Sequence, residues 1–159
     1  MENIVPCLCF RKEAEEAARF YTSLFPNSRI VDISRYGSAG PLPEGTVMAV
    51  SFELDGKPFL ALNGPEFEFT EAISFQIRCE SQEEVDSYWD QLTANGEESY
   101  CGWLKDRFGV SWQVTPSALS ELLADPDPAR SQGAMRAMLQ MKKLDLEALE
   151  RAASGVEIG

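Results

Sequence analysis

The sequence predicts an α+β protein built from two tandem strand–helix–three-strand (βαβββ) modules and a helical C-terminal tail. Three observations support this: two amphipathic helices align at a fixed offset, strand-like segments flank both helices in the same order, and the chain beyond Pro116 is rich in helix formers. The expected boundaries are residues 1–66 and 67–116 for the modules and 117–159 for the tail. We expect all three parts to form one compact domain.

The first module follows from the periodicity of its apolar residues. Residues 3–10 are typical of a strand, and residues 13–25 show the i, i+3, i+4, i+7 spacing of an amphipathic helix that Pro26 ends. Strands are predicted at 28–36, 47–54 and 58–63, with a Gly/Pro-rich loop at 37–45. Asp55 and Gly56 predict a tight hairpin turn between the last two strands.

The second module repeats this order. A strand is predicted at 72–79, and a helix at 81–95 that begins with Ser81 as its cap. A strand pair at 98–105 and 110–115 follows. Six positions of the two helices match at an offset of 68 residues: Glu15/Glu83, Glu16/Glu84, Ala17/Val85, Phe20/Tyr88, Tyr21/Trp89 and Leu24/Leu92. Chance similarity of two amphipathic helices is the alternative to duplication, but the repeated strand order favours duplication.

The tail carries two apolar stripes at helical spacing, separated from the modules by the breaker Asp125-Pro126-Asp127-Pro128. The first stripe contains Ala134, Met138 and Met141, and the second contains three leucines, at 144, 146 and 149. Stripes of this kind are typical of core or subunit contacts. We expect the tail to pack across the modules or against a second subunit.

The composition excludes several classes of function. A net charge of −12 and a pI near 4.4 argue against nucleic acid and anionic membranes as partners. No apolar run approaches the roughly 18–20 residues of a membrane span, and the N-terminal apolar run is too short for a signal peptide. We therefore expect a cytoplasmic protein.

The four cysteines fit a reducing compartment. Their spacing matches no zinc pattern, so ordinary buried thiols are expected. A strand would place Cys7 and Cys9 on one face.

The chain contains no histidine. This excludes Ser-His-Asp and Cys-His catalysis and removes the commonest protein metal ligand. The loop at 37–45 lacks the ending of a phosphate-binding loop, and no glycine-rich dinucleotide fingerprint follows a strand. We therefore expect no nucleotide or other cofactor.

Residues 101–113, CGWLKDRFGVSWQ, concentrate the residues suited to a binding site. Strand alternation predicts that Cys101, Trp103 and Lys105 share one face. It also predicts that Trp112 packs in the core while Gln113 lies on the polar side. Asp106 is expected to support the turn through its side chain. A hairpin that merely packs its tryptophans in the core remains an equal alternative.

Four segments carry a family resemblance: EEAARFYTSLFPNS (15–28), SFELDGKPFLALNG (51–64), TEAISFQIRCESQEEVD (70–86) and CGWLKDRFGVSWQVTP (101–116). With these segments the chain resembles the vicinal oxygen chelate superfamily, which includes glyoxalases and bleomycin-resistance proteins. It is most similar to the PhnB-like branch, often labelled demethylubiquinone methyltransferase-like. The resemblance covers nearly the whole chain, including DPDPAR and MLQMKK in the tail. It implies that each module curls its sheet into a half-barrel around a cleft.

The resemblance also implies where a metal would bind in metal-using relatives. Their last ligand, a glutamate four residues after the glycine of a D-x-x-G turn, corresponds here to Gln113. Their other ligand positions fall near Val5, near Ala72, and at Leu60 or Ala61. We therefore expect no metal site and none of the metal-dependent activities of the superfamily. A true methyltransferase using S-adenosylmethionine is not expected either, because the glycine-rich loop of that class is missing.

The sequence leaves three functions open, and it does not decide whether the protein is an enzyme. The first is metal-independent binding of a small organic molecule, with Trp103, Tyr36, Phe75 and Gln113 as cleft walls and Asn63 and Gln76 as polar contacts. Cys101 is a further ligand contact. The second is a metal-independent isomerase or lyase that uses Cys101 or Glu53. The third is a largely structural homodimer. A homodimer is expected under all three, with a cleft that two subunits can share.

Overall fold

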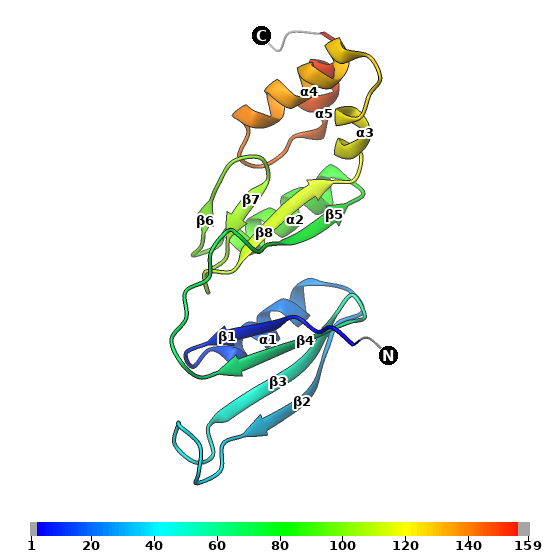
Figure 1. Cartoon of the computed structure of the whole chain (residues 1–159). Helices are drawn as coiled ribbons and strands as arrows, with labels where there is room; N and C mark the ends of the chain where they lie inside the picture. Colours follow the sequence, from blue (N-terminus) through cyan, green and yellow to red (C-terminus); the bar gives the residue numbers. More distant parts are fainter. Residues whose placement is uncertain (1–2, 156–159) are drawn as a thin grey trace. The chain divides into compact units, whose positions relative to one another are not determined.

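The computed structural model describes residues 3–155, and the chain divides into two compact units, Met1–Glu68 and Phe69–Gly159. Each unit contains one four-stranded mixed sheet with one helix on its face (Figure 1). Both sheets have the same strand order, β1-β4-β3-β2 in the first unit and β5-β8-β7-β6 in the second. The predicted α+β fold with two βαβββ modules is therefore confirmed.

The first unit contains β1 (Cys7–Phe10), α1 (Ala14–Leu24), β2 (Arg29–Arg35), β3 (Val47–Leu54) and β4 (Lys57–Asn63). β1 runs parallel to β4, and β3 pairs antiparallel with both β2 and β4. Asp55 and Gly56 have φ angles of 51° and 75°. These left-handed values are those of the two-residue hairpin turn predicted there. Tyr21 of α1 stacks on Phe52 of β3, and both side chains are almost completely buried. This contact lies at the centre of the core of the first unit.

The second unit contains β5 (Phe75–Cys79), α2 (Gln82–Thr93), β6 (Glu97–Glu98), β7 (Trp103–Lys105) and β8 (Ser111–Pro116). The predicted cap of α2 is confirmed, because the Ser81 hydroxyl accepts a hydrogen bond from the Glu84 N–H at 3.2 Å. α2 covers one face of this sheet, where Trp89 and Trp112 are both nearly buried. The opposite face of the sheet is the one that carries the candidate site.

One predicted strand is wrong. The segment 98–105 is not a single strand, because residues 99–102 form a tight turn between β6 and β7. Cys101 and Gly102 lie in this turn with φ angles of 62° and 82°. The Trp103 N–H donates to the Tyr100 carbonyl across this turn. Strand alternation therefore does not apply to Cys101, and the prediction that Cys101 shares one strand face with Trp103 and Lys105 is wrong.

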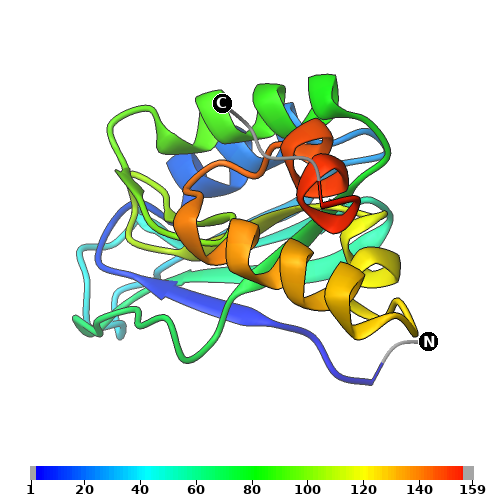
Figure 2. The same cartoon turned by 90° about the horizontal axis from the view of Figure 1, so that it is seen from above.

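The tail contains α3 (Leu119–Leu123), α4 (Pro128–Gln140) and α5 (Leu146–Ala153), and it belongs to the second unit. α4 and α5 pack closely (Figure 2), and a Cβ at Gly133 would lie only 2.4 Å from the Ala152 carbonyl oxygen. Leu119, Leu144 and Leu149 form the buried centre of this cluster. Of the helices between residues 3 and 155, none has the length and apolar content needed to cross a bilayer.

The tail is attached to the second module by hydrogen bonds. The N–H groups of Cys101 and Gly102 donate to the carbonyls of Met141 and Lys142, both at 2.8 Å. The Gln82 amide of α2 binds the next part of the tail: it donates to the Leu144 carbonyl at 3.0 Å and accepts from the Leu146 N–H at 2.9 Å. The turn before β7 and the start of α2 thus hold the tail. Packing across the modules or against a second subunit stays a prediction.

Candidate functional site

Three of the sequence-predicted site residues share the open face of the second sheet, the face opposite α2. In the register of the sheet, Gln113 of β8 lies beside Gln76 of β5 and opposite Trp103 of β7. Their chain neighbours Trp112 and Leu104 are nearly buried on the other face. Side chains alternate along a strand, so Gln76, Gln113 and Trp103 point to the same side.

A continuous chain of hydrogen bonds crosses this face. The Gln113 amide Nε2 donates to the Ser74 hydroxyl at 2.9 Å, and Gln76 Nε2 donates to Gln113 Oε1 at 3.4 Å. Arg78 Nε then donates to Gln76 Oε1 at 3.4 Å. We call Ser74, Gln76, Arg78 and Gln113 the amide row. The two longer bonds are weak, so a ligand can displace them at little cost.

Arg78 gives the amide row a positive end. Among residues 3–155, Arg78 forms no ion pair, although the chain carries a net charge of −12. Arg78 and Ser74 were not among the site residues predicted from the sequence. Alternation in SFQIR (74–78) was the signal that could have found them, because it places Ser74, Gln76 and Arg78 on one face.

Two further features of the open face suit a polar ligand with an apolar part. The half-buried Trp103 lines a hollow of about 150 Å³, where Lys105 pairs with Glu71 at 2.8 Å. The hydroxyl of Ser111, two residues before Gln113, is buried and has no hydrogen-bond partner among the described residues. A buried hydroxyl without a partner is costly, which makes it a natural contact for a bound polar group or water.

The structure separates Phe75 and Cys101 from the amide row. Phe75 lies beside Trp112 in the register, with ring centroids 5.4 Å apart, on the face that α2 covers. Phe75 was predicted as a cleft wall with Gln113, but the two point to opposite sides of the sheet. The half-buried Cys101 lies in the turn that holds the tail.

The remaining predicted residues lie in the first unit and make contacts within its scaffold. The nearly buried Asn63 amide accepts from the Ala14 N–H at 2.9 Å and donates to the Val47 carbonyl at 3.1 Å. Asn63 thereby ties the start of α1 to β3. The Tyr36 hydroxyl donates to the Asn63 main-chain carbonyl, and Glu53 forms an ion pair with Arg29. Ligand contacts from these three residues stay predictions.

Asp106 confirms the role predicted for it in the turn between β7 and β8. Its Oδ1 accepts from the N–H groups of Phe108 and Val110 at 2.8 and 3.1 Å, and its Oδ2 accepts from Trp112 Nε1 at 2.8 Å. The side chain is only 3% exposed. Asp106 thus joins the turn to the core and fixes the start of β8, the strand that carries Gln113.

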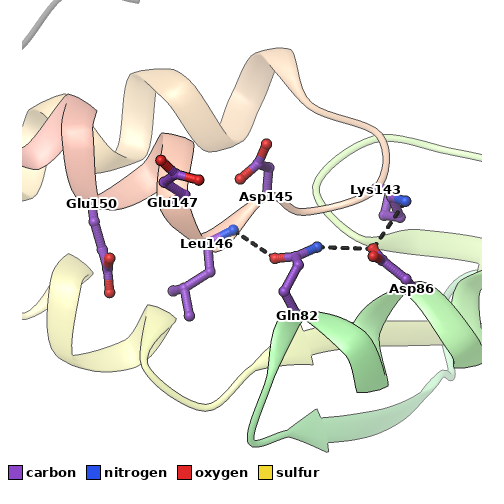
Figure 3. A pocket seen from close by; sticks show the side chains of 7 residues that line it. All are labelled: Gln82, Asp86, Lys143, Asp145, Leu146, Glu147 and Glu150. Atoms are coloured by element: carbon purple, nitrogen blue, oxygen red, sulfur yellow. Dashed lines mark hydrogen bonds and ion pairs between the residues drawn. The ribbon is translucent and has the colours of Figure 1, made fainter.

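A larger hollow of about 440 Å³ lies between α2 and α5 and holds none of the predicted site residues (Figure 3). Its lining consists of Gln82, Asp86, Lys143, Asp145, Leu146, Glu147 and Glu150. The pKa of Asp86 is lowered by the hydrogen bond from Gln82 and by Lys143, whose Nζ lies 2.9 Å from its Oδ1. The contacts among these residues attach the tail to α2.

In the described part of the first unit, residues 3–68, the strands carry no counterpart of the amide row. The buried pairs Leu8–Ala61 and Ile77–Val114 occupy equivalent places in the two registers. One position earlier on each strand, Cys7 and Leu60 correspond to Gln76 and Gln113. The polar row is therefore specific to the second module.

Comparisons with known proteins agree with this fold. A family model described as 3-demethylubiquinone-9 3-methyltransferase matches residues 2–115. A Bacillus cereus PhnB protein carrying the same description is 40% identical, with 73% of this chain and 100% of that chain covered and a TM-score of 0.68. No curated protein matches significantly.

More distant structures share the fold alone. A Pseudomonas aeruginosa protein is 20% identical, over 73% of this chain and 98% of that chain, with a TM-score of 0.61. The fosfomycin resistance protein FosX from Listeria monocytogenes, solved with Mn(II) and sulfate, is 15% identical over 77% of this chain and 97% of that chain, with a TM-score of 0.54. With the family model covering both βαβββ modules, this chain belongs to the family described as 3-demethylubiquinone-9 3-methyltransferase, the PhnB-like branch of the glyoxalase and bleomycin-resistance fold.

Proposed function

We propose that the protein binds a small organic acid with an apolar or aromatic part on the open face of the second sheet, without a divalent metal. The observation that carries this proposal is the amide row, in which Arg78, an arginine with no ion-pair partner among residues 3–155, ends a chain of two amides and a hydroxyl. Arginine recognises carboxylates through parallel hydrogen bonds. The two amides supply further donors and acceptors that orient a ligand.

The ligand's apolar part would pack against Trp103, which lies beside Gln113 in the sheet. An indole offers a large apolar surface with a defined orientation. The Ser111 hydroxyl, which has no partner among the described residues, would donate a hydrogen bond to the same ligand or to a water bound with it. Charge supports an acidic group over a basic one, because Arg78 is the cation of the row and the row contains no carboxylate.

The side chains of the amide row are poor ligands for a divalent metal. The structure of FosX contains Mn(II), but the row offers two neutral amides and a hydroxyl, and Arg78 would repel a cation. Divalent transition metals such as Mn(II) and Zn(II) are held in proteins mainly by imidazole, thiolate or carboxylate ligands. No cluster of three or more such side chains occurs within residues 3–155. We therefore derive no step through a metal.

An isomerase or lyase remains the second candidate, with less support. Cys101 would need a neighbouring cation to favour its thiolate. Lys105, the cation that strand alternation placed on the same face as Cys101, is paired with Glu71. We do not assign the methyltransferase activity named in the family's description to this chain, because a fold does not imply an activity. A cytoplasmic, homodimeric protein remains our expectation.

The experiment is a binding screen with matched ligands and matched variants. Thermal unfolding and tryptophan fluorescence would be followed with benzoate, with its neutral isostere benzamide, and with benzylamine. Binding of benzoate-type acids is expected to stabilise the protein and to change the fluorescence of Trp103. Arg78→Gln should weaken binding of the acid at least about tenfold, because a charge-assisted hydrogen bond contributes roughly 1.5–3 kcal/mol.

Arg136→Gln is the matched control, since Arg136 is an exposed arginine of α4 in the same unit. The control should bind as the unchanged protein does. Equal weakening by both substitutions would point to a general charge effect and contradict the proposal. Tighter binding after added Mn(II) or Zn(II) would contradict the metal-independent part of it.

A further inference from the structure

The four cysteines differ in their surroundings, and three of them, Cys7, Cys9 and Cys101, are not the buried thiols that the sequence predicted. Cys79 is 1% exposed, whereas Cys7 is exposed and Cys9 is half-buried. Cys7 and Cys9 lie on β1, which is the edge strand of the first sheet. Neither residue belongs to the amide row of the second unit.

The two thiols point to the same face of the sheet. Leu8 and Phe10, which alternate with them along β1, are buried on the side of α1. Cys7 and Cys9 therefore lie on the open face, as the strand period of two requires. The structure also couples them: burial raises the pKa of the Cys7 thiol, and the charge and hydrogen bonding of Cys9 raise it further. Such effects require the two sulfur atoms to be close.

The spacing of the pair disfavours an internal disulfide. Residues two apart on a strand have Cα atoms about 6.6 Å apart, and their Cβ atoms are separated to a similar extent. A disulfide requires a Cβ–Cβ distance of about 3.5–4.5 Å. Closing that bond would distort β1 and its parallel pairing with β4, which continues from Cys7 to Phe10. An atom that bridges the two sulfurs needs no such distortion.

The surroundings restrict which atom can bridge them. The neighbours of Cys7 and Cys9 on β4 are Leu60 and Leu62, which offer no ligand atom in their side chains. No third histidine, cysteine or carboxylate joins the pair to form a metal-binding cluster within residues 3–155. Structural zinc takes four ligands, so two thiolates beside leucines suit a soft cation that is satisfied by two sulfur atoms.

We propose that Cys7 and Cys9 form a two-coordinate site for a soft monovalent cation, copper(I). Zinc–thiolate bonds are about 2.3 Å long, and two metal–sulfur bonds of about that length in a near-linear arrangement span a sulfur–sulfur separation of roughly 4.5 Å. Side chains two apart on a strand reach that separation when both lean toward the gap. The neighbouring Leu60 and Leu62 side chains offer no oxygen or nitrogen ligand that would compete with the two sulfur atoms.

The binding step is balanced without an electron transfer. Two thiols and one copper(I) ion give a bis-thiolate copper(I) complex with one negative charge, and two protons are released to the solvent. Copper stays in its monovalent state, and neither sulfur is oxidised. The step needs no co-reactant besides copper(I).

The test is an anaerobic titration of the full-length protein with copper(I) in competition with the chromophoric chelator bathocuproine disulfonate. One copper(I) per chain is expected to bind. Cys7→Ser and Cys9→Ser should each weaken that binding by about 10²–10⁴-fold, because the second thiolate is presented at a high effective concentration by the same strand. Should Cys9→Ser fail to fold, alkylation of the exposed Cys7 in the unchanged protein should abolish binding equally.

Cys101→Ser is the control, because it removes a half-buried thiol of the other unit. It should bind copper(I) like the unchanged protein. The proposal is overturned if either single serine variant binds within threefold of the unchanged protein, or if mild oxidation readily forms a Cys7–Cys9 disulfide that mass spectrometry detects. Benzoate binding on the amide row is measured separately, so failure of one proposal leaves the other intact.

Discussion

Replacement of Asp106 by asparagine tests how the closing hairpin of the second module is fixed. The Asp106 carboxylate is buried and accepts three hydrogen bonds, two from backbone N–H groups and one from the Trp112 indole. In Asp106→Asn, the amide oxygen can keep the two backbone bonds. The amide nitrogen would then face Trp112 Nε1–H, so that a donor opposes a donor.

The magnitude follows from these bonds. A hydrogen bond to a charged group contributes roughly 1.5–3 kcal/mol, and an unsatisfied buried donor costs roughly 1–3 kcal/mol. Asp106→Asn should therefore lower the free energy of unfolding by about 2–3 kcal/mol. Asp106→Ala leaves all three donors without an acceptor and should cost about 4 kcal/mol.

Urea unfolding followed by tryptophan fluorescence is the suitable assay, because Trp89, Trp103 and Trp112 all belong to the second unit. Asp90→Asn, on the exposed side of α2, is the control and should change stability by less than about 0.5 kcal/mol. In the background of Trp112→Phe, the cost of Asp106→Asn should fall by about 1–2 kcal/mol, because the opposing donor is gone. A cost below about 1 kcal/mol, or one that is unchanged in that background, would refute this reasoning.

Three further predictions concern the tail and the core. Gln82→Leu should lower the free energy of unfolding by about 2 kcal/mol and expose the segment before α5 to protease, since the tail loses two hydrogen bonds. Gln91→Leu, on the exposed side of the same helix, is the control and should have neither effect. Gly102→Ala should destabilise the second unit by at least about 2 kcal/mol, because φ at Gly102 is 82° and an added Cβ would lie 2.7 Å from the Val114 carbonyl oxygen. Gly37→Ala is the control and should be nearly neutral, because a Cβ added there would have no neighbouring atom within 4 Å. Burial raises the pKa of Cys79 from 9.0 to about 11, so the folded state holds a proton that the unfolded state has lost between these values. Stability should therefore fall as the pH rises from 9 to 11, remain unaffected by this group below pH 9, and lose this dependence in Cys79→Ala.

The sequence predicted the fold because local patterns and tertiary packing agree in both modules. The bounds of β3 are those that alternation predicts, and the Asp55-Gly56 turn has the dihedral angles that its residues favour. Ser81 caps α2 as its position indicates. These features depend on neighbours within a few residues, which is why the sequence shows them.

The candidate site was only partly predictable, for two physical reasons. Gln76, Gln113 and Trp103 share a face because they lie on regular strands, so alternation finds them. The turn at Cys101 is different: a cysteine with φ of 62° is uncommon, and its N–H group binds a segment forty residues away in the chain, at Met141. No local pattern encodes a contact of that range.

The attachment of the tail to this turn bears on how far results from shorter relatives apply to the present chain. The family match ends at residue 115, before α3 begins, whereas the N–H groups of Cys101 and Gly102 depend on carbonyls at Met141 and Lys142. A version cut at the end of the match would leave both N–H groups to water and would release the turn that leads into Trp103. Two parts of the chain therefore fix the orientation of the Trp103 indole: the sheet, which the family shares, and the tail, which lies outside the family match. In relatives without the tail, the residue at the place of Trp103 lacks this support. Ligand preferences measured on such relatives therefore do not apply directly to the present chain.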